Sequence, residues 1–209
     1  MQYETGQFLF PPRPEHVITS DMLGFYQSRG WVAQYKKNGT CTIIIIDPIG
    51  DVKFVTRHGK PHRAWSCPEK LKKTLSVLAP QKRWTVLVAE VLHSKTPTIK
   101  DTIYIHDIIV HQNVHLVGSS FAERQKILDW IIPQKGIEAY SHWEFEPGIW
   151  RAKNLSEGFE KAWVSIWNPK IDEGFVLKNP DATLKWCVRE NSNSDWLVKV
   201  RYPTKNYQF

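Results

Sequence analysis

Short runs of β-branched and aromatic residues recur along almost the whole chain of 209 residues, and they constrain its fold more than any other feature. Such runs are typical of β-strands, because branched and aromatic side chains pack well on a pleated surface. We expect strands over residues 31–35, 41–47, 52–57, 84–92, 102–110, 173–178, 184–188 and 196–201. So many strands in a chain of this length predict a fold dominated by β-sheets.

Helices are signalled between these runs by capping boxes, in which a Ser is followed three residues later by a Glu. One box is formed by Ser66 and Glu69, and the other by Ser120 and Glu123. The expected helices span residues 70–78, 124–130 and 156–167. Because strand clusters alternate irregularly with helices, we predict an α+β fold with mostly antiparallel sheets flanked by helices.

The length of the chain fits one domain, which we expect to span residues 1–209. A hydrophobic content of 42% and a charged content of 23% are enough to build a core and argue against disorder. We find no internal repeat, and the only Pro-dense stretch, residues 10–14, predicts an extended lead-in. A single folded domain is therefore the simplest organisation.

The sequence also indicates where the protein works. It has no run of about 18 apolar residues and no signal-peptide pattern, so we expect a soluble protein that is neither exported nor bound to a membrane. Cys41, Cys67 and Cys187 are an odd number at spacings that suit neither a disulfide framework nor a metal site. These features favour a cytoplasmic location.

The balance of charge is basic. Lys and Arg number 28 against 21 Asp and Glu, a net charge of +7, and the isoelectric point is about 9.3. A surface of this sign favours polyanions such as nucleic acid.

The sequence Lys36-Lys37-Asn38-Gly39 lies between two expected strands and has two interpretations. Asn-Gly at such a place is typical of a β-hairpin, because both residues tolerate positive φ. Alternatively, a lysine at the end of a strand can act as a nucleophile. An amine attacks only when it is neutral, and an ordinary lysine has a pKa of about 10.4, so such a site needs nearby cations or desolvation.

Two further segments carry candidate charges. Lys199 and Arg201 alternate along a strand and so share one face, which fits a cationic site or an ordinary solvated edge strand. Glu173 lies at a turn that enters an apolar strand, where it is either a ligand for a hard metal ion or simply a turn residue.

Six short motifs, taken in order, resemble the motif set of the covalent nucleotidyltransferase superfamily, which includes ATP-dependent DNA ligases, RNA ligases and mRNA capping enzymes. The motifs are Lys36-Lys37-Asn38-Gly39, Thr56-Arg57-His58-Gly59-Lys60, Val88-Ala89-Glu90-Val91, Tyr104-Ile105-His106-Asp107, Glu173-Gly174-Phe175-Val176-Leu177-Lys178 and Trp196-Leu197-Val198-Lys199-Val200-Arg201. The resemblance covers residues 31–201 and implies the ATP-grasp-like nucleotidyltransferase domain of DNA and RNA ligases. Six matches in order are far more specific than any one of them.

The resemblance also implies a catalytic role for several residues. Lys36 matches the lysine that attacks the α-phosphorus of ATP, expels pyrophosphate and forms a lysyl–AMP phosphoramidate. Lys199 and Arg201 match the basic pair that holds the α-phosphate, and Glu173 matches the acid that binds the catalytic metal, which we expect to be Mg²⁺.

The remaining matches imply nucleotide binding. Gln34 corresponds to the position at the adenine edge, Arg57 to an arginine that contacts the sugar and the terminal phosphate of the polynucleotide, and Glu90 to the acceptor for a ribose hydroxyl. His106 takes the place of the aromatic ring that stacks on adenine, and Lys178 ends the motif that Glu173 begins. Gln34 and His106 also fit as ordinary strand residues.

The sequence departs from the family pattern in three ways. Asn38 replaces the usual Asp, Arg201 replaces a second Lys, and only eight residues follow Arg201, so we expect no C-terminal OB-fold domain. Such a domain would react slowly with ATP, use a separate protein that supplies the missing function, or have lost part of the reaction cycle. The substrate implied is DNA or RNA with a 5′-phosphate and a 3′-hydroxyl, with DNA nick sealing favoured. An RNA ligase and a non-catalytic binder of nucleic-acid ends are alternatives, while a capping-type guanylyltransferase is disfavoured.

Overall fold

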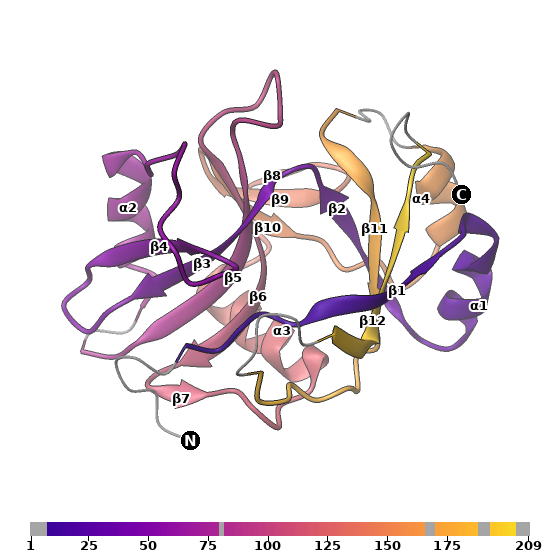
Figure 1. The fold of residues 1–209 in the computed structure, drawn as a ribbon, viewed down its shortest axis with the longest axis horizontal. Helices are drawn as coiled ribbons and strands as arrows, with labels where there is room; N and C mark the ends of the chain where they lie inside the picture. Colours follow the sequence, from indigo (N-terminus) through magenta and orange to yellow (C-terminus); the bar gives the residue numbers. More distant parts are fainter. Residues whose placement is uncertain (1–7, 80–81, 166–169, 188–192, 204–209) are drawn as a thin grey trace.

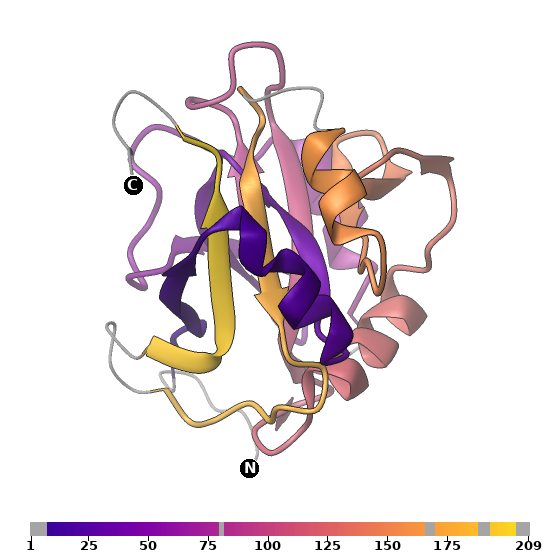
Figure 2. The ribbon, with the colours of Figure 1, turned by 90° about the vertical axis from the view of Figure 1, so that its right-hand side faces the viewer.

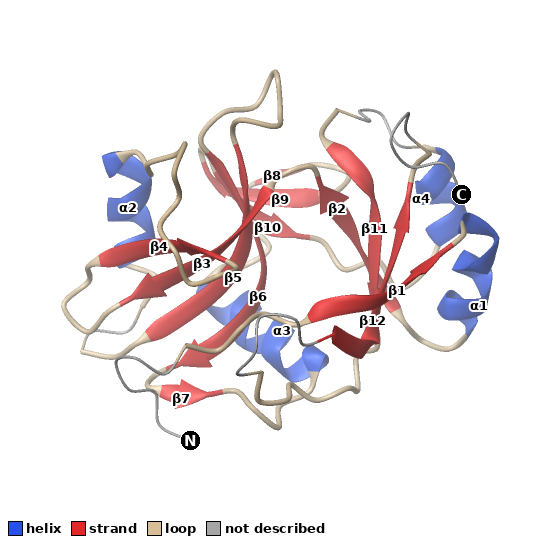
Figure 3. Cartoon of the chain, in the orientation of Figure 1, coloured by secondary structure: helices blue, strands red, loops and turns tan. Residues whose placement is uncertain are grey.

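The computed structural model describes residues 8–79, 82–165, 170–187 and 193–203. Two β-sheets face each other, and helices lie on their outer sides (Figure 1). Strands predominate over helices throughout (Figure 3). Of the strand pairs in the described residues, only β1 with β12 and β10 with β6 are parallel. The predicted α+β class with mostly antiparallel sheets is confirmed.

The larger sheet has the strand order β4-β3-β5-β6-β10-β9-β8, and β7 pairs with β6. Its strands are β3 (Thr40–Ile46), β4 (Val52–Thr56), β5 (Thr85–Leu92), β6 (Thr102–His111), β7 (Val114–His115), β8 (Ile137–Glu138), β9 (His142–Glu146) and β10 (Ile149–Ala152). Apolar side chains of β3, β5 and β6 form its core together with Leu71 and Leu75 of α2 (Glu69–Ser76) and Leu128 of α3 (Phe121–Ile131).

The smaller sheet has the order β1-β12-β11-β2. Its strands are β1 (Arg13–Ile18), β2 (Val32–Lys37), β11 (Asp172–Lys178) and β12 (Asn193–Arg201). Figure 2 shows α1 (Leu23–Ser28) and α4 (Phe159–Val164) on its outer face, and the short helix η1 (Ser20–Met22) precedes α1. Leu23 and Phe159 of these helices are fully buried against that face. The opposite face of the sheet is therefore the one turned toward the larger sheet.

The expected strands were found except one. Residues 184–187 form no strand, and residue 188 lies outside the described residues. Leu184 is instead buried in the core of the larger sheet, and its backbone nitrogen donates to Ser119 O at 2.9 Å. An apolar segment can bury a side chain in the core without pairing as a strand. The apolar composition of residues 184–188 therefore led to a wrong strand prediction.

The helix predictions were partly right. Ser120 and Glu123 form the predicted capping box of α3. The box predicted for α2 is wrong, because Pro68 is the N-cap and Glu69 is already the first helical residue. A proline disfavours helical backbone in the residue before it, so this helix cannot extend back toward Ser66. The third helix, α4, starts at Phe159 rather than at residue 156, and residues 166–167 lie outside the described ranges.

No local sequence pattern predicts β1, α1 or β7–β10. The shortest of these, β7 and β8, have two residues each, and β1 contains Pro14, which interrupts the usual strand composition. Among the described residues, no helix is long and apolar enough to cross a membrane.

The hairpin interpretation of Asn38-Gly39 is wrong. Neither residue has a positive φ, and the flanking strands β2 and β3 belong to different sheets. Gly39 is needed for close approach instead, because a Cβ there would lie 2.9 Å from Val91 O and 3.0 Å from the Glu90 side chain. The chain thus crosses from one sheet to the other directly after Lys36 and Lys37.

Candidate active site

Alternation along the smaller sheet gathers the predicted basic residues on its inner face. Gly174 of β11 lies opposite both Lys36 and Arg201, and Val176 lies opposite both Gln34 and Lys199. Because residues directly opposite across an antiparallel ladder point to the same face, these side chains form two adjacent rows. The register thus brings Lys36 next to residues more than 160 positions away in the sequence.

The larger sheet contributes a row of its own. Cys41 of β3 pairs with Glu90 of β5, which pairs with Tyr104 of β6. His106 follows two residues later on β6 and therefore points to the same side. Arg57 comes directly after β4, at the end of this sheet nearest the crossing from β2 to β3.

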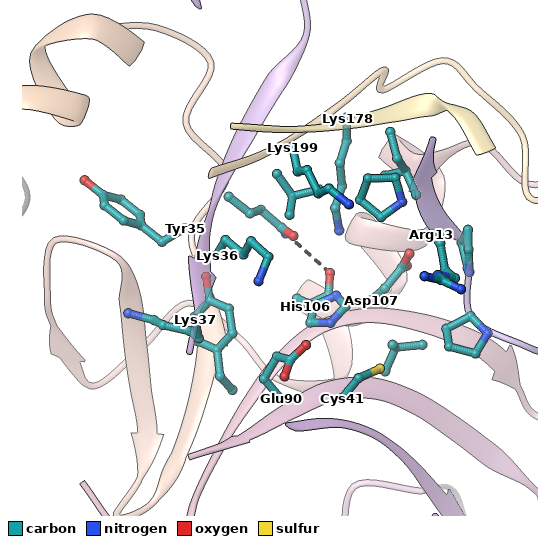
Figure 4. A pocket seen from close by; sticks show the side chains of 18 of the residues that line it. Arg13, Tyr35, Lys36, Lys37, Cys41, Glu90, His106, Asp107, Lys178 and Lys199 are labelled. Atoms are coloured by element: carbon teal, nitrogen blue, oxygen red, sulfur yellow. Dashed lines mark hydrogen bonds between the residues drawn. The ribbon is translucent and has the colours of Figure 1, made fainter. Parts of the chain in front are cut away.

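These rows enclose a cavity of about 250 Å³ (Figure 4). Eight of the nine predicted site residues line it: Gln34, Lys36, Arg57, Glu90, His106, Lys178, Lys199 and Arg201. The ninth, Glu173, does not line the cavity but contacts Lys36, since Lys36 Nζ donates to Glu173 Oε2. The structure therefore brings all nine together, while their individual roles remain predictions.

The cavity is strongly cationic around Lys36. Lys199, Arg57 and Arg201 line it, and Arg13, from the N-terminal strand β1, adds a further cation. Partial burial lowers the pKa of Lys199, and the charges of Arg201 and Lys36 lower it further. A concave site with this many cations favours a multiply charged anion such as a triphosphate.

Glu173 is placed between two of these cations. Its Oε2 accepts from Lys36 and lies 3.4 Å from Arg201 Nη2. Among the described residues, no group of three His, Cys, Asp or Glu side chains could hold a metal by itself. Mg²⁺ is commonly held by one or two carboxylates together with substrate phosphates and water, so Glu173 fits a metal that is shared with a nucleotide.

Glu90 is an inward carboxylate on the opposite wall. Burial raises its pKa to about 7, although the charges of Lys36 and Lys95 act in the other direction. A carboxylate in such surroundings needs hydrogen-bond donors, and no side chain among the described residues donates to it. It is therefore well placed to accept a hydroxyl hydrogen from a ligand.

His106 lines the cavity from β6. Burial lowers the pKa of His106 to about 3, so the imidazole is neutral, and its buried Nδ1 has no hydrogen-bond partner among the described residues. Gln34 donates to His106 O at 3.3 Å and to Asn154 Oδ1 at 2.7 Å, which fixes both the strand and the amide. A neutral ring with an unused polar atom suits a flat heteroaromatic ligand.

Lys178 ends β11 and lines the cavity from the smaller sheet. It is buried, its Nζ lies 4.5 Å from the centre of the Phe121 ring, and burial lowers its pKa to about 8. Asp107, which also lines the cavity, is held by Arg124 through two hydrogen bonds of 3.0 Å. This buried pair fixes the base of the wall.

No family model and no curated protein matches this sequence. Solved structures do match in fold. Mycobacterial DNA ligase D, complexed with ATP, has a TM-score of 0.66 and 16% identity over 96% of this chain. The ligase domain of M. tuberculosis LigD has a TM-score of 0.63 and 17% identity over 95%, and the ATP-dependent DNA ligase of bacteriophage T7, in complex with ATP, has 0.53 and 16% over 92%.

The chain has the fold of ATP-dependent DNA ligase catalytic domains. It spans 62% and 61% of the length of the two mycobacterial chains and 68% of the T7 enzyme. The resemblance to the covalent nucleotidyltransferase superfamily is thereby confirmed at the level of fold. In this ligase fold the cavity between the two sheets is built from the six motifs.

Sequence reasoning missed several residues around the site in this ligase fold. Arg13 lines the cavity, but its only signal was the Pro-dense stretch that contains it, residues 10–14, which predicts an extended chain and not a pairing partner. Lys37 and Asp172 were passed over because each is the neighbour of a motif residue. Both are fully buried and paired with each other at 2.7 Å.

Proposed function

We propose that the chain is the adenylyltransferase domain of an ATP-dependent polynucleotide ligase and that Lys36 is its nucleophile. The observation that carries this proposal is the position of Lys36 Nζ in a cavity with Arg13, Arg57, Lys199 and Arg201, within the ligase fold. A basic triphosphate site around one lysine has a direct use in nucleotidyl transfer.

In the first step Lys36 Nζ, once it has lost its proton, attacks the α-phosphorus of ATP. A P–N bond forms, the bond between the α-phosphorus and the bridging oxygen breaks, and pyrophosphate leaves with that oxygen. Lys199 and Arg201 stabilise the charge on the non-bridging oxygens as phosphorus is attacked in line. Glu173 is ion-paired with Lys36 in this structure, and its carboxylate is also the group that would hold Mg²⁺.

The remaining residues bind and orient the nucleotide. Glu90 accepts from a ribose hydroxyl, His106 packs on the base, and Arg57 contacts the sugar and then the phosphate of the polynucleotide end. If Mg²⁺ binds, Glu173 would be the residue of this chain that holds it, and the ion would neutralise charge on the transferred phosphoryl group. Gln34 keeps the base pocket in place through its bonds to His106 and Asn154.

Two further transfers complete the proposed reaction. A 5′-phosphate oxygen attacks the phosphorus of the AMP on Lys36, so that a pyrophosphate linkage forms and Lys36 is released. The 3′-hydroxyl then attacks the 5′-phosphorus, which forms the phosphodiester bond and releases AMP. A nicked DNA duplex is the favoured substrate, since the solved structures with this fold are DNA ligases.

The test is to incubate the protein with ATP labelled at the α-phosphate and Mg²⁺ and to run a denaturing gel. We expect label on the protein, none from α-labelled GTP, and no label on Lys36→Ala. The matched control is Lys70→Ala, because Lys70 is exposed on α2, away from the cavity. Lys37→Ala is unsuitable as a control, since Lys37 is buried and ion-paired.

The outcomes separate the alternatives. Label from GTP instead of ATP favours a capping-type enzyme. No label on the wild-type protein, together with binding of DNA ends, favours the non-catalytic binder and refutes the proposal. Nicked duplexes with a DNA or an RNA strand on each side of the nick then distinguish a DNA ligase from an RNA ligase.

A further inference from the structure

Behind the candidate nucleophile lies a buried ion pair that the proposed chemistry does not use. Lys37 Nζ donates to Asp172 Oδ1 at 2.7 Å, and the exposed fractions of the two side chains are 1% and 0%. Removal of two charges from water is costly unless the geometry is good and every polar atom has a partner. Such a pair beside an active site calls for a structural reason.

The pair is fully satisfied and ties three segments together. Lys37 Nζ also donates to Ser141 Oγ at 2.7 Å, and the Tyr140 hydroxyl donates to Asp172 Oδ2. Four aromatic rings surround the ammonium group, with centroids 5.2–5.8 Å from Nζ: Tyr35, Tyr104, Tyr140 and Trp150. The ends of β2 and β11 are thus bonded to each other and to the segment before β9.

The position of the pair coincides with a break in the ladder between β11 and β2. Asp172 lies opposite Lys37 and Gly174 lies opposite Lys36, so Glu173 is an extra residue with no partner. In an unbroken ladder Glu173 would lie opposite Lys37 and would point away from the cavity, because a shift of one residue turns a side chain to the other face. The bulge is what directs Glu173 toward Lys36.

A bulge disrupts the ladder and needs other interactions to hold it. Gly174 permits the bend of β11. The Lys37–Asp172 bond determines that Glu173 is the residue without a partner on β2, because Asp172 lies opposite Lys37 only when Glu173 is bulged out of the ladder. We infer that Lys37 and Asp172 are positioning residues: they form a clamp that sets the register of β11 and thereby places the Glu173 carboxylate at Lys36. The consequence for catalysis rests on the proposed function, while the register itself does not.

The first test reads the register directly from cross-strand NMR contacts of residue 37. In the wild type, and in the core control Leu75→Ala, residue 37 should contact residue 172. In Lys37→Met the contact with residue 172 should be lost, because the carboxylate of Asp172 is no longer held. Asp172→Asn, which keeps its shape, gives a second reading if Lys37→Met does not fold. Retention of the contact in the folded variant overturns the clamp.

The second test is a double-mutant cycle on the rate of self-adenylylation. Lys37→Met should slow labelling by about 10- to 100-fold, as is usual when a group that orients a catalytic residue is removed. In a Glu173→Gln background, the same change should alter the rate by less than about 3-fold, since its effect passes through Glu173.

Simple multiplication of the two effects, or an equal slowing by Leu75→Ala, indicates general destabilisation and refutes the positioning role. If the wild-type protein takes up no label, the proposed function fails, and the NMR contacts still decide whether the clamp exists.

Discussion

Replacement of Gly174 by Ala should destabilise the smaller sheet more than its size suggests. Gly174 has a φ of +137°, which L-residues rarely adopt, and an added Cβ would lie 2.0 Å from Val200 O and 2.9 Å from Arg201 Cα. Backbone strain of this kind costs about 1–3 kcal/mol, and forced overpacking adds about 1–3 kcal/mol. We therefore expect Gly174→Ala to lower the free energy of unfolding by about 2–6 kcal/mol.

Gly158→Ala provides the matched control. Gly158 also has a positive φ, +69°, but a Cβ there would meet nothing within 4 Å. Only backbone strain remains, so the expected loss is about 1–2 kcal/mol. Urea unfolding of the two variants at the same pH measures the difference in their free energies of unfolding, provided that the slope of the free energy against urea concentration is the same in both.

The reasoning also predicts an effect on the site. Val200 and Arg201 lie on β12 across from Gly174, so the strand must move to accept the methyl group, and Arg201 moves with it. Labelling by ATP should fall in Gly174→Ala and stay normal in Gly158→Ala. Equal stability of the two variants within about 0.5 kcal/mol would show that the close approach is not rigid and would refute this account.

Three further predictions concern charge and capping. Burial raises the pKa of Glu90 from 4.5 to about 7, so folding favours the protonated form of this side chain. The resulting stabilisation of the folded protein is full below pH 4.5 and is lost as the pH rises through 7. Glu90→Gln should remove this pH dependence from the free energy of unfolding, measured with urea between about pH 5 and 8. Arg124→Met leaves the carboxylate of Asp107 buried without its cation and should cost about 3–5 kcal/mol at pH 7. Arg124 holds the pKa of Asp107 below its usual range. The difference in free energy of unfolding between Arg124→Met and the wild type should therefore shrink as the pH falls below about 4, which urea unfolding at several pH values will measure. Ser120→Ala should cost about 1 kcal/mol in thermal or urea unfolding, whereas Ser66→Ala should cost almost nothing, since only Ser120 caps a helix.

Much of the sheet architecture was predictable because most strands have a recognisable local sequence pattern. Alternation of polar and apolar residues along residues 196–201 placed Lys199 and Arg201 on one face before any partner strand was known. Strands such as β1 and β8 have almost no recognisable sequence pattern, because they are short or contain proline. They form only where a neighbouring strand offers free hydrogen-bonding groups. Pairing between β1 and β12 joins residues about 180 positions apart, which no local pattern encodes.

The residues that the structure brings together could be predicted as a set, but their geometry could not, and their roles stay predictions. Motif order indicated which side chains should lie close together. Eight of the nine line the cavity and Glu173 contacts Lys36, although Asn38-Gly39 joins two sheets rather than closing a hairpin. The same local sequence serves both arrangements, because glycine is favoured by a tight turn and also by a close approach to another strand. Only the tertiary contact with Glu90 and Val91 decides between them.

The bulge at Glu173 shows why a motif match alone is not enough to place a side chain. Strict alternation from Gly174 would turn Glu173 toward the side of Lys37 and would separate it from Lys36. The contact between Glu173 and Lys36 therefore depends on the extra residue in β11. In the proposal above, this bulge is held by the buried pair Lys37–Asp172, whose members are the neighbours of two motif residues. A relative that kept Lys36 and Glu173 but lost Lys37 and Asp172 would need another device to hold its carboxylate at the lysine.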